Sequence, residues 1–387
     1  MITAKNNLIQ TMDISPCPQH KLVTDGITES KVNGLVVLSP AGKRAFRRII
    51  YVDTYGGATM WEKIKKGEVP PHHLRGCLEL ARMGYEVALA EPLDNFYFSY
   101  RRNPFPHDLK MLKMVRSWLG RDGIVFCGHN NLFWLPFLRA LGAVHCRIVS
   151  NMWGREELNF SRTHSGIIGL TRAAAEQAKK LAPKVKVAPL GWGADLSVYP
   201  QLPYRPEAFF SCGITLRDHR TLSLAASRCR HSLQVIVPGM IENLKWPSNV
   251  QLFDGGRGWN VDDKKLSFQE LLQHHYARSA GSLIILKSDP LESNAVGCTE
   301  LLEVMAMARP VIMTRTGALP TEIDVEKLGF GIFVPSESPE ALAEAIDFLG
   351  DHPETAEAMG RKAREAAESY YNISRFANDL HHFFESF

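Results

Sequence analysis

The sequence lacks several features that would place it in a special class. It has no run of about 18 uncharged apolar residues, which excludes a membrane-spanning helix at the level of sequence. The first ten residues have no apolar core, so we expect no signal peptide there. The seven cysteines are odd in number and form no CxxC pair, which argues against a disulfide framework or a structural zinc site. These absences predict a globular protein of the reducing cytosol.

The net charge of the 387 residues is only +4, but it is unevenly distributed. Up to Asp195 there are 27 Lys and Arg against 16 Asp and Glu, and the remainder has 18 against 25. The opposite signs of the two halves indicate two domains with different partners. The basic half suits an anionic ligand or surface, although no nucleic-acid-binding module is recognisable.

Short apolar runs alternate with helical stretches along the first half. Apolar runs predict strands at 49–53, 85–90, 123–127, 146–150, 166–170 and 185–189, with a hairpin around 22–24 and 35–38. Helices are expected over 71–83, 131–141 and 173–181. Strands without polar alternation, separated by helices, are typical of a parallel sheet buried on both faces.

A Gly-, Pro- and aromatic-rich stretch at 191–207 interrupts this alternation and predicts an interdomain linker. Strands are then expected at 209–212, 233–237, 282–286 and 310–314, and helices at 218–228, 267–280, 299–308, 339–349, 353–370 and 373–387. The pattern predicts two doubly wound α/β domains in tandem. Ligands of such folds bind at the carboxyl ends of strands, which makes the cleft between the domains the expected site.

The most informative segment is residues 288–317, SDPLESNAVGCTELLEVMAMARPVIMTRTG. A predicted strand ends at Lys287, and a helix begins near Gly297-Cys298-Thr299. Free N–H groups and the positive end of the dipole make a helix start a phosphate site. Glu303 lies one turn beyond Thr299 on the same face, within reach of the ribose of a bound nucleotide. The alternative is an ordinary helix whose acidic residues suit its dipole.

The run LLEVMAMARPVI, with a glycine six residues ahead of Glu303, resembles the donor-binding signature of GT-B glycosyltransferases, in particular the retaining family 4 group. The resemblance implies two Rossmann-like domains facing across a cleft. Residues 1–195 would bind the acceptor and 196–370 the nucleotide sugar, with a helix at 371–387 crossing back to the first domain. It further implies that Glu303 binds ribose and that the diphosphate lies at Gly297, Cys298 and Thr299.

This sequence departs from the family pattern at one glutamate. Counting from Pro310-Val311 places the first glutamate of the signature at Ala295. The resemblance therefore leaves its sugar-contacting role to Glu292, Ser293 or Asn294.

Other segments fit the same family in the same order. In the loop containing Gly213 and Thr215, the resemblance implies that Arg217 neutralises the donor pyrophosphate; the alternative is a local pair with Asp218. Gly57, in the Gly56-Gly57 pair, resembles the glycine that lets backbone approach the donor, although a simple turn is an equal alternative.

His129 follows a buried strand, and in relatives a histidine at this place contacts the transferred sugar; a structural histidine is the alternative. His72 and His73 open a helix where they would touch acceptor or, on the slightly favoured interpretation, form an exposed pair. Glu303, Arg217 and His129 are the expected catalytic set.

A basic amphipathic segment lies within 96–121, where Lys110, Lys113 and Arg116 recur on one side of a helix. Such a helix binds an anionic membrane or a phosphorylated acceptor, or it simply flanks the sheet in solvent. The sequence thus favours an anionic acceptor or a place on the inner membrane face.

The expected reaction is sugar transfer from a nucleoside diphosphate sugar, UDP- or GDP-linked, to a hydroxyl acceptor with retention. No D-x-D motif stands in a suitable loop, so neither a metal nor another cofactor is expected. A nucleotide-sugar epimerase of the same fold and a degenerate binding subunit are the alternatives. A dinucleotide-dependent oxidoreductase would need G-x-G-x-x-G, which residues 55–58 do not supply.

Overall fold

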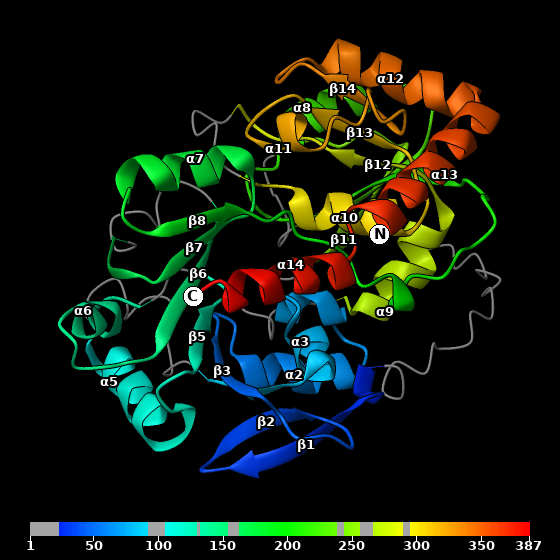
Figure 1. Cartoon of the computed structure of the whole chain (residues 1–387). Helices are drawn as coiled ribbons and strands as arrows, with labels where there is room; N and C mark the ends of the chain where they lie inside the picture. The colour runs from blue at the N-terminus through cyan, green and yellow to red at the C-terminus, as the bar shows by residue number, and fades with distance from the viewer. Residues whose placement is uncertain are drawn as a thin grey trace.

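The computed structural model describes residues 23–91, 105–129, 132–153, 162–237, 244–255, 266–288 and 295–387. It contains two sheets, one in each half of the chain (Figure 1). The predicted pair of α/β domains built on parallel sheets is confirmed. The first sheet spans residues 27–189 and the second 208–334.

The first sheet has eight strands in the order β1-β2-β4-β3-β5-β6-β7-β8. Strands β3 to β8 pair in parallel, whereas β1 and β2 form an antiparallel hairpin on the edge. The strand bounds are β1 Ile27–Val32, β2 Leu35–Pro40, β3 Arg47–Val52, β4 Tyr85–Leu89, β5 Ile124–Cys127, β6 Arg147–Met152, β7 Gly166–Gly169 and β8 Lys186–Pro189. The helices are α2 Gly57–Lys65, the 3-10 turn η1 Pro71–Leu74, α3 Cys77–Met83, α5 Phe105–Met114 with the π-helical turn η2 Val115–Leu119, α6 Trp134–Ala140, α7 Arg172–Leu181 and the 3-10 turn η4 Leu196–Val198.

The second sheet is parallel throughout, in the order β11-β10-β9-β12-β13-β14. Its strands are β9 Ala208–Ser211, β10 Leu233–Val237, β11 Val250–Asp254, β12 Ser279–Ile284, β13 Val311–Thr314 and β14 Gly331–Val334. Its helices are α8 His219–Ala226, α9 Phe268–Glu270 with the turns η6 Leu271–His275 and η7 Tyr276–Arg278, α10 Cys298–Ala306, α11 Leu319–Glu322, α12 Pro339–Asp351 and α13 Pro353–Ser369.

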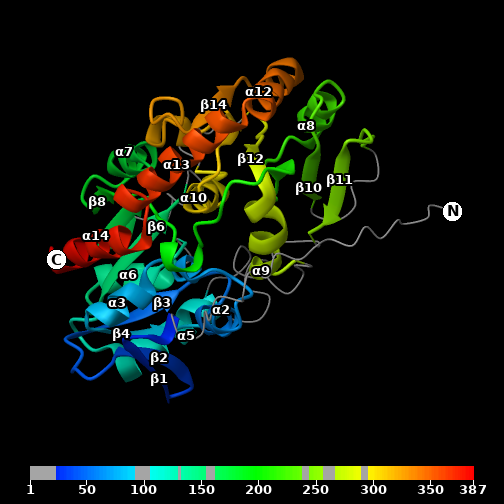
Figure 2. The ribbon, with the colours of Figure 1, turned by 90° about the vertical axis from the view of Figure 1, so that its right-hand side faces the viewer.

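The last helix, α14 (Ile373–Glu385), lies against the first domain beside α3 (Figures 1 and 2). Phe376 and Phe384 are fully buried, and Arg47 of β3 donates to the carbonyl of Phe384 at 3.1 Å. A backbone hydrogen bond joins the segment after α13 to the end of the first domain, because Ala194 N donates to Tyr371 O at 3.0 Å. The C-terminal helix therefore ties the second half of the chain to the first.

Several predicted elements are shifted or broken. The hairpin is formed by β1 and β2, a few residues later than expected at its first strand. The helix expected over 71–83 is interrupted because Arg75 and Gly76 adopt left-handed backbone with φ of 52° and 81°. The helix expected over 267–280 ends at Arg278, where β12 begins earlier than predicted. The sequence patterns did not predict α2, β11, α11 and β14. None of the helices that the structure describes combines the length and apolar character needed to cross a membrane.

Candidate functional site

A cavity of about 510 Å³ lies between the two domains. Its first wall is built at the carboxyl ends of β3 and β5 and at η1, and its second at the loop after β9 and the start of α10. This volume is in the range of small-molecule sites, and the carboxyl ends of parallel strands are where α/β sheets bind ligands.

Predicted residues from both domains line this cavity. They are His129, Gly213, Thr215, Arg217, Gly297, Cys298, Thr299 and Glu303. Gly57, which was also predicted to approach the donor, is not among the residues that line the cavity; its neighbour Gly56 is. The Gly57 N–H donates to Ala90 O at 2.9 Å, and a Cβ on Gly57 would lie 3.1 Å from the Leu89 side chain. Ser293, Asn294 and Glu292 lie outside the described residues.

Helix α10 begins at Cys298, close to where the sequence predicted. Its N-cap is Gly297, whose φ of 88° lies in the left-handed region that favours glycine. A Cβ at this position would lie 3.0 Å from the Ile284 side chain, so the glycine also lets the helix start pack closely on β12. A helix start of this kind presents backbone N–H groups and a positive dipole to an anion.

Glu303 projects from the second turn of α10 and is only 8% exposed. Its Oε2 accepts a hydrogen bond from the Tyr276 hydroxyl at 2.8 Å. Burial, and then the nearby Cys212 and Glu303, raise the pKa of Tyr276 well above its ordinary value, so the hydroxyl remains a donor. Sequence reasoning missed Tyr276, because its partner lies 27 residues away.

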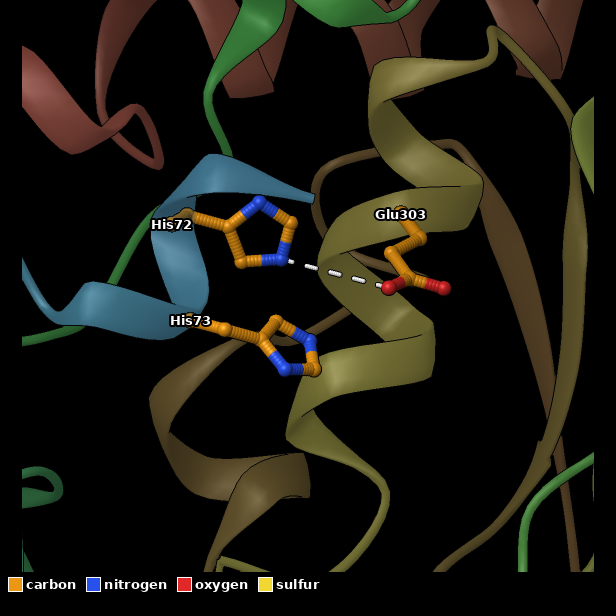
Figure 3. A group of neighbouring side chains, drawn as sticks. All are labelled: His72, His73 and Glu303. Atoms are coloured by element: carbon orange, nitrogen blue, oxygen red, sulfur yellow. Dashed lines mark ion pairs between the residues drawn. The ribbon is translucent and has the colours of Figure 1, made fainter. Parts of the chain in front are cut away.

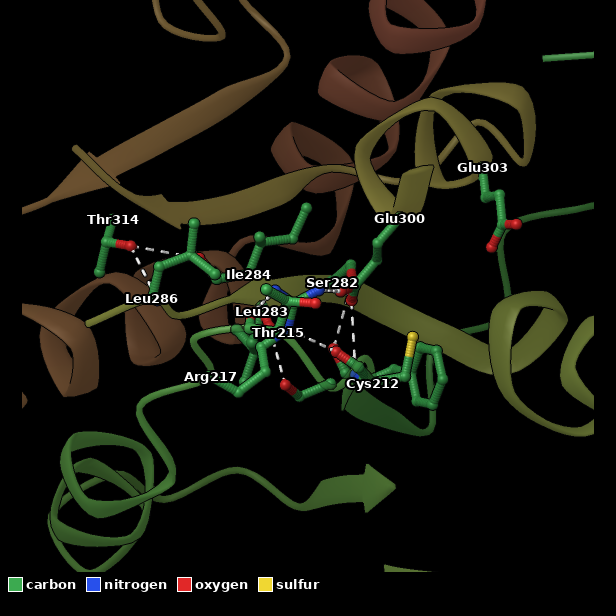
Figure 4. A network of polar contacts seen from close by, with 12 residues as sticks. Cys212, Thr215, Arg217, Ser282, Leu283, Ile284, Leu286, Glu300, Glu303 and Thr314 are labelled. Carbon is green, nitrogen blue, oxygen red and sulfur yellow. Dashed lines mark hydrogen bonds and ion pairs between the residues drawn. The ribbon is translucent and has the colours of Figure 1, made fainter. Parts of the chain in front are cut away.

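Arg217 is bound by protein groups on every nitrogen (Figure 4). Its Nη2 meets Glu300 Oε2 at 2.7 Å, Nε donates to Cys212 O at 2.7 Å and Nη1 donates to Thr215 O at 3.1 Å. The alternative of a local pair with Asp218 is wrong, since Asp218 accepts from Thr221 N and caps α8. Arg217 thus lines the cavity with its charge already balanced.

The surroundings of this pair explain its geometry. Burial raises the pKa of Glu300, which Arg217 and Ser282 offset only in part. The Ser282 hydroxyl donates to Glu300 Oε1 at 2.9 Å. A Cβ at Gly213 would lie 2.3 Å from Arg217 Nη2, so the glycine makes room for the guanidinium.

The first-domain wall is organised around Asp53, at the end of β3. Asp53 Oδ2 accepts from the Tyr51 hydroxyl at 2.8 Å, and Oδ1 lies 3.4 Å from His129 Nδ1. Burial opposes ionisation, but His129, Arg75 and Tyr51 hold the pKa of Asp53 well below its usual range. The His129 ring stacks on Trp153 at 5.5 Å. The Asp53 carboxylate therefore orients His129 at the cavity. Sequence reasoning missed this pair, although Asp53 is the last residue of the strand predicted at 49–53.

His72 and His73 approach Glu303 across the cleft (Figure 3). The interpretation of an exposed histidine pair is wrong, because His72 is completely buried. Its Nε2 lies 3.9 Å from Glu303 Oε1. Burial and the Arg75 charge lower the pKa of His72 to about 3, so the ring is neutral near neutral pH.

Within the described ranges, His72, His73 and Glu303 form the one group of three side chains whose ligand atoms are close enough for a metal, all within 4.8 Å. However, His72 Nδ1 accepts from the Asp195 N–H at 3.4 Å. A neutral imidazole with an acceptor Nδ1 carries its proton on Nε2, the atom that faces Glu303. The Nε2 proton therefore faces the Glu303 carboxylate, at a separation of 3.9 Å that is longer than a hydrogen bond.

The basic helix predicted within 96–121 is formed in part by α5 and η2; residues 96–104 lie outside the described residues. Lys110 donates to Glu91 O at 2.8 Å, whereas Lys113 and Arg116 are exposed. Leu109, on the same helix, is 40% exposed.

Two Rossmann-like domains that face a common cavity, with a last helix returning to the first, define the GT-B class of proteins. Solved structures of glycosyltransferases share this fold. Sucrose-phosphate synthase from Thermosynechococcus elongatus has a TM-score of 0.62 at 12% identity, covering 88% of this chain and 98% of that chain. For α,α-trehalose 6-phosphate synthase from Burkholderia multivorans the TM-score is 0.60 at 11% identity, with coverage of 89% and 97%. For Anabaena HepE in complex with UDP and glucose, the TM-score is 0.57 at 13% identity, covering 88% of this chain and 100% of that chain.

Residues 271–366 match the model of the family described as Glycosyl transferases group 1. This segment contains Tyr276, Glu300, Glu303 and all of α10. No curated protein sequence matches the chain significantly. The group 1 domain and the GT-B fold together support a glycosyltransferase, the class that the sequence predicted.

Proposed function

We propose that this chain transfers a sugar from a UDP- or GDP-linked donor to a hydroxyl acceptor, with retention of anomeric configuration and without a bound metal ion. The observation that carries the proposal is the placement of Glu303 and the start of α10 together in the interdomain cavity. A diphosphate at Gly297, Cys298 and Thr299 leaves the ribose one helical turn further along, at Glu303. Anabaena HepE, solved in complex with UDP, with UDP and glucose and with UDP-glucose, supports the donor class.

The reacting sugar would extend from the diphosphate toward the first domain, where His129 is held by Asp53 at 3.4 Å. The charge that develops on the leaving diphosphate would be stabilised by the helix dipole and by cationic side chains. The two walls of the cleft would exclude water and so suppress hydrolysis of the donor.

The acceptor would be bound by the first domain. Its excess of 27 basic over 16 acidic residues supports an anionic acceptor, or a cytoplasmic membrane surface that carries one. Activity that falls steeply with ionic strength, together with binding to anionic liposomes, would support this part of the proposal; activity and binding that are independent of salt would contradict it.

Thermal unfolding with a panel of UDP-, GDP-, ADP- and TDP-sugars tests the donor site. A specific donor at about 1,000 times its Kd stabilises the fold by about 4 kcal/mol. Glu303→Gln should abolish the shift, while Glu340→Gln, whose side chain is 63% exposed, should retain it. The proposal is wrong if no donor shifts the Tm or if Glu303→Gln responds like the wild type.

Product analysis tests the chemistry. Acceptor-dependent release of the nucleoside diphosphate separates transfer from epimerisation of the donor. The anomeric signal of the product by NMR tests retention, and activity that persists in a chelator tests independence from metal.

A further inference from the structure

Arg75 is a buried cation at the interdomain cavity that no sequence motif singled out. It follows η1 and is only 6% exposed, yet it lines the cavity. Among the residues that the structure describes, its Nε and Nη1 have no hydrogen-bond partner. The carboxylate that it faces, Asp53 Oδ2, lies 3.7 Å from Nε, beyond hydrogen-bond length. Buried polar groups are normally hydrogen-bonded, so a guanidinium with two unpartnered nitrogens calls for an explanation.

Two tryptophans hold the guanidinium of Arg75 in place. Its central carbon lies 4.2 Å from the ring centroid of Trp153 and 4.5 Å from that of Trp192. Contacts of this kind, within about 6 Å of a ring, are attractive and restrict the orientation of the cation. Arg75 also adopts a φ of 52°, which is uncommon outside glycine. Backbone in this region persists where surrounding structure imposes it, and it is concentrated at ligand sites.

The wall opposite Arg75 is the start of α10. Ala295 N, three residues before the helix, donates to Trp153 O at 3.2 Å. Trp153 therefore touches this turn through its backbone and supports Arg75 through its ring. Burial raises the pKa of Cys298 to about 12, and the Arg75 charge opposes this rise. The same cavity is lined by Arg75 from the first domain and by Gly297, Cys298 and Thr299 from the second.

The charges in the cavity distinguish Arg75 from Arg217. Arg217 is joined to Glu300 at 2.7 Å and makes two further bonds to carbonyls. Arg75 shares Asp53 with His129, and its Nε and Nη1 are buried without a hydrogen-bond partner. The arginine with unused hydrogen-bonding capacity at the cavity is therefore the one contributed by the first domain.

We propose that Arg75 binds the diphosphate of the nucleotide sugar from the first-domain side, opposite the start of α10. This inference rests on the proposed function. A guanidinium donates paired N–H groups that match phosphate oxygens. The anion is then held from both walls, so donor binding joins the two domains, and Arg75 stabilises the negative charge of the leaving diphosphate.

Calorimetric titration with inorganic pyrophosphate tests Arg75 directly, because the probe carries neither base nor sugar. Arg75→Gln should weaken pyrophosphate binding by about 10- to 100-fold, the loss of one or two charge-assisted hydrogen bonds. The matched control is Arg48→Gln, since Arg48 also stacks on a tryptophan, Trp118 at 5.2 Å, and pairs with a carboxylate, Glu86 at 2.7 Å. The control should bind pyrophosphate like the wild type.

A structural role for Arg75 gives a different result. Arg75→Gln would then lower the Tm but leave pyrophosphate affinity unchanged in the folded protein, and this outcome overturns the inference. Should Arg75→Gln not fold, Arg75→Lys carries the test: the charge is kept but the paired geometry is lost. Pyrophosphate binding should weaken several-fold while uridine and guanosine binding stays unchanged; equal pyrophosphate affinity overturns the inference.

The wild-type titrations separate this inference from the proposed function. If neither pyrophosphate nor UDP nor GDP binds the wild type, the proposed function fails and the inference fails with it. If UDP or GDP binds in a Glu303-dependent way and Arg75→Gln binds it equally well, only the inference fails.

Discussion

The Arg217–Glu300 pair provides the sharpest test of how this site is built. The two side chains meet at 2.7 Å and are 8% and 4% exposed as residues. Arg217→Met leaves the Glu300 carboxylate buried with only the Ser282 hydroxyl and the Cys212 N–H as donors. Removing one partner of a buried pair costs about 3–5 kcal/mol. For a domain of the size of the second one, this lowers the Tm by roughly 6–20 °C.

The double variant Arg217→Met/Glu300→Leu should recover most of this loss. No uncompensated charge remains in it, and apolar residues of similar volume often replace buried pairs without cost. The single changes should therefore be non-additive by about 2 kcal/mol or more. Because burial raises the pKa of Glu300, Arg217→Met should lose more stability at pH 8 than at pH 5, where protonation neutralises the stranded carboxyl group.

Urea unfolding of Arg217→Met, Glu300→Leu and the double variant measures these free energies, with Arg228→Met as the matched control. Arg228 pairs with Glu340 at the surface, where the side chains are 44% and 63% exposed, so its loss should cost less than about 1 kcal/mol. The reasoning is refuted if Arg217→Met costs no more than this control and instead loses affinity for the donor. That result would restore to Arg217 the pyrophosphate role that the family resemblance implied.

Three further predictions concern the frame of the site. Gly193→Ala should lower the Tm by several degrees, because its Cβ would lie 2.3 Å from the Asn372 backbone, whereas Gly191→Ala, with its nearest atom at 3.8 Å, should unfold like the wild type. Phe384→Ala should cost about 3–5 kcal/mol in urea unfolding, since it opens a cavity between α14 and the first domain; a loss below 1 kcal/mol would contradict this packing. Burial, and then Asp195, raise the pKa of Glu79 to about 7. Its ionisation therefore opposes folding, and stability should fall by roughly 3 kcal/mol as pH rises from about 4.5 to above 7; Glu79→Gln should flatten this slope, and an unchanged slope would contradict the assignment.

The local elements of the donor wall were readable from the sequence. The start of α10 followed from a polar loop between an apolar strand and a helix. This is a local signal, since a helix cap is set by residues within one or two turns. The ribose-binding role expected of Glu303 came instead from the family resemblance, by counting from Pro310-Val311. The break at Arg75 and Gly76 was not readable in this way, because a non-glycine residue with positive φ has no sequence signature.

Patterns along the chain were sufficient to predict two parallel-sheet domains and the helix start that precedes Glu303. Which charges are balanced depends on contacts between elements that are distant in the chain. Arg217 meets Glu300 across 83 residues of sequence, and the tryptophan rings around Arg75 come from Trp153 and Trp192. The reason is physical: apolar periodicity fixes which face of an element is buried, but a buried charge finds its partner only when distant elements have packed, and that packing decides whether it remains open to a ligand.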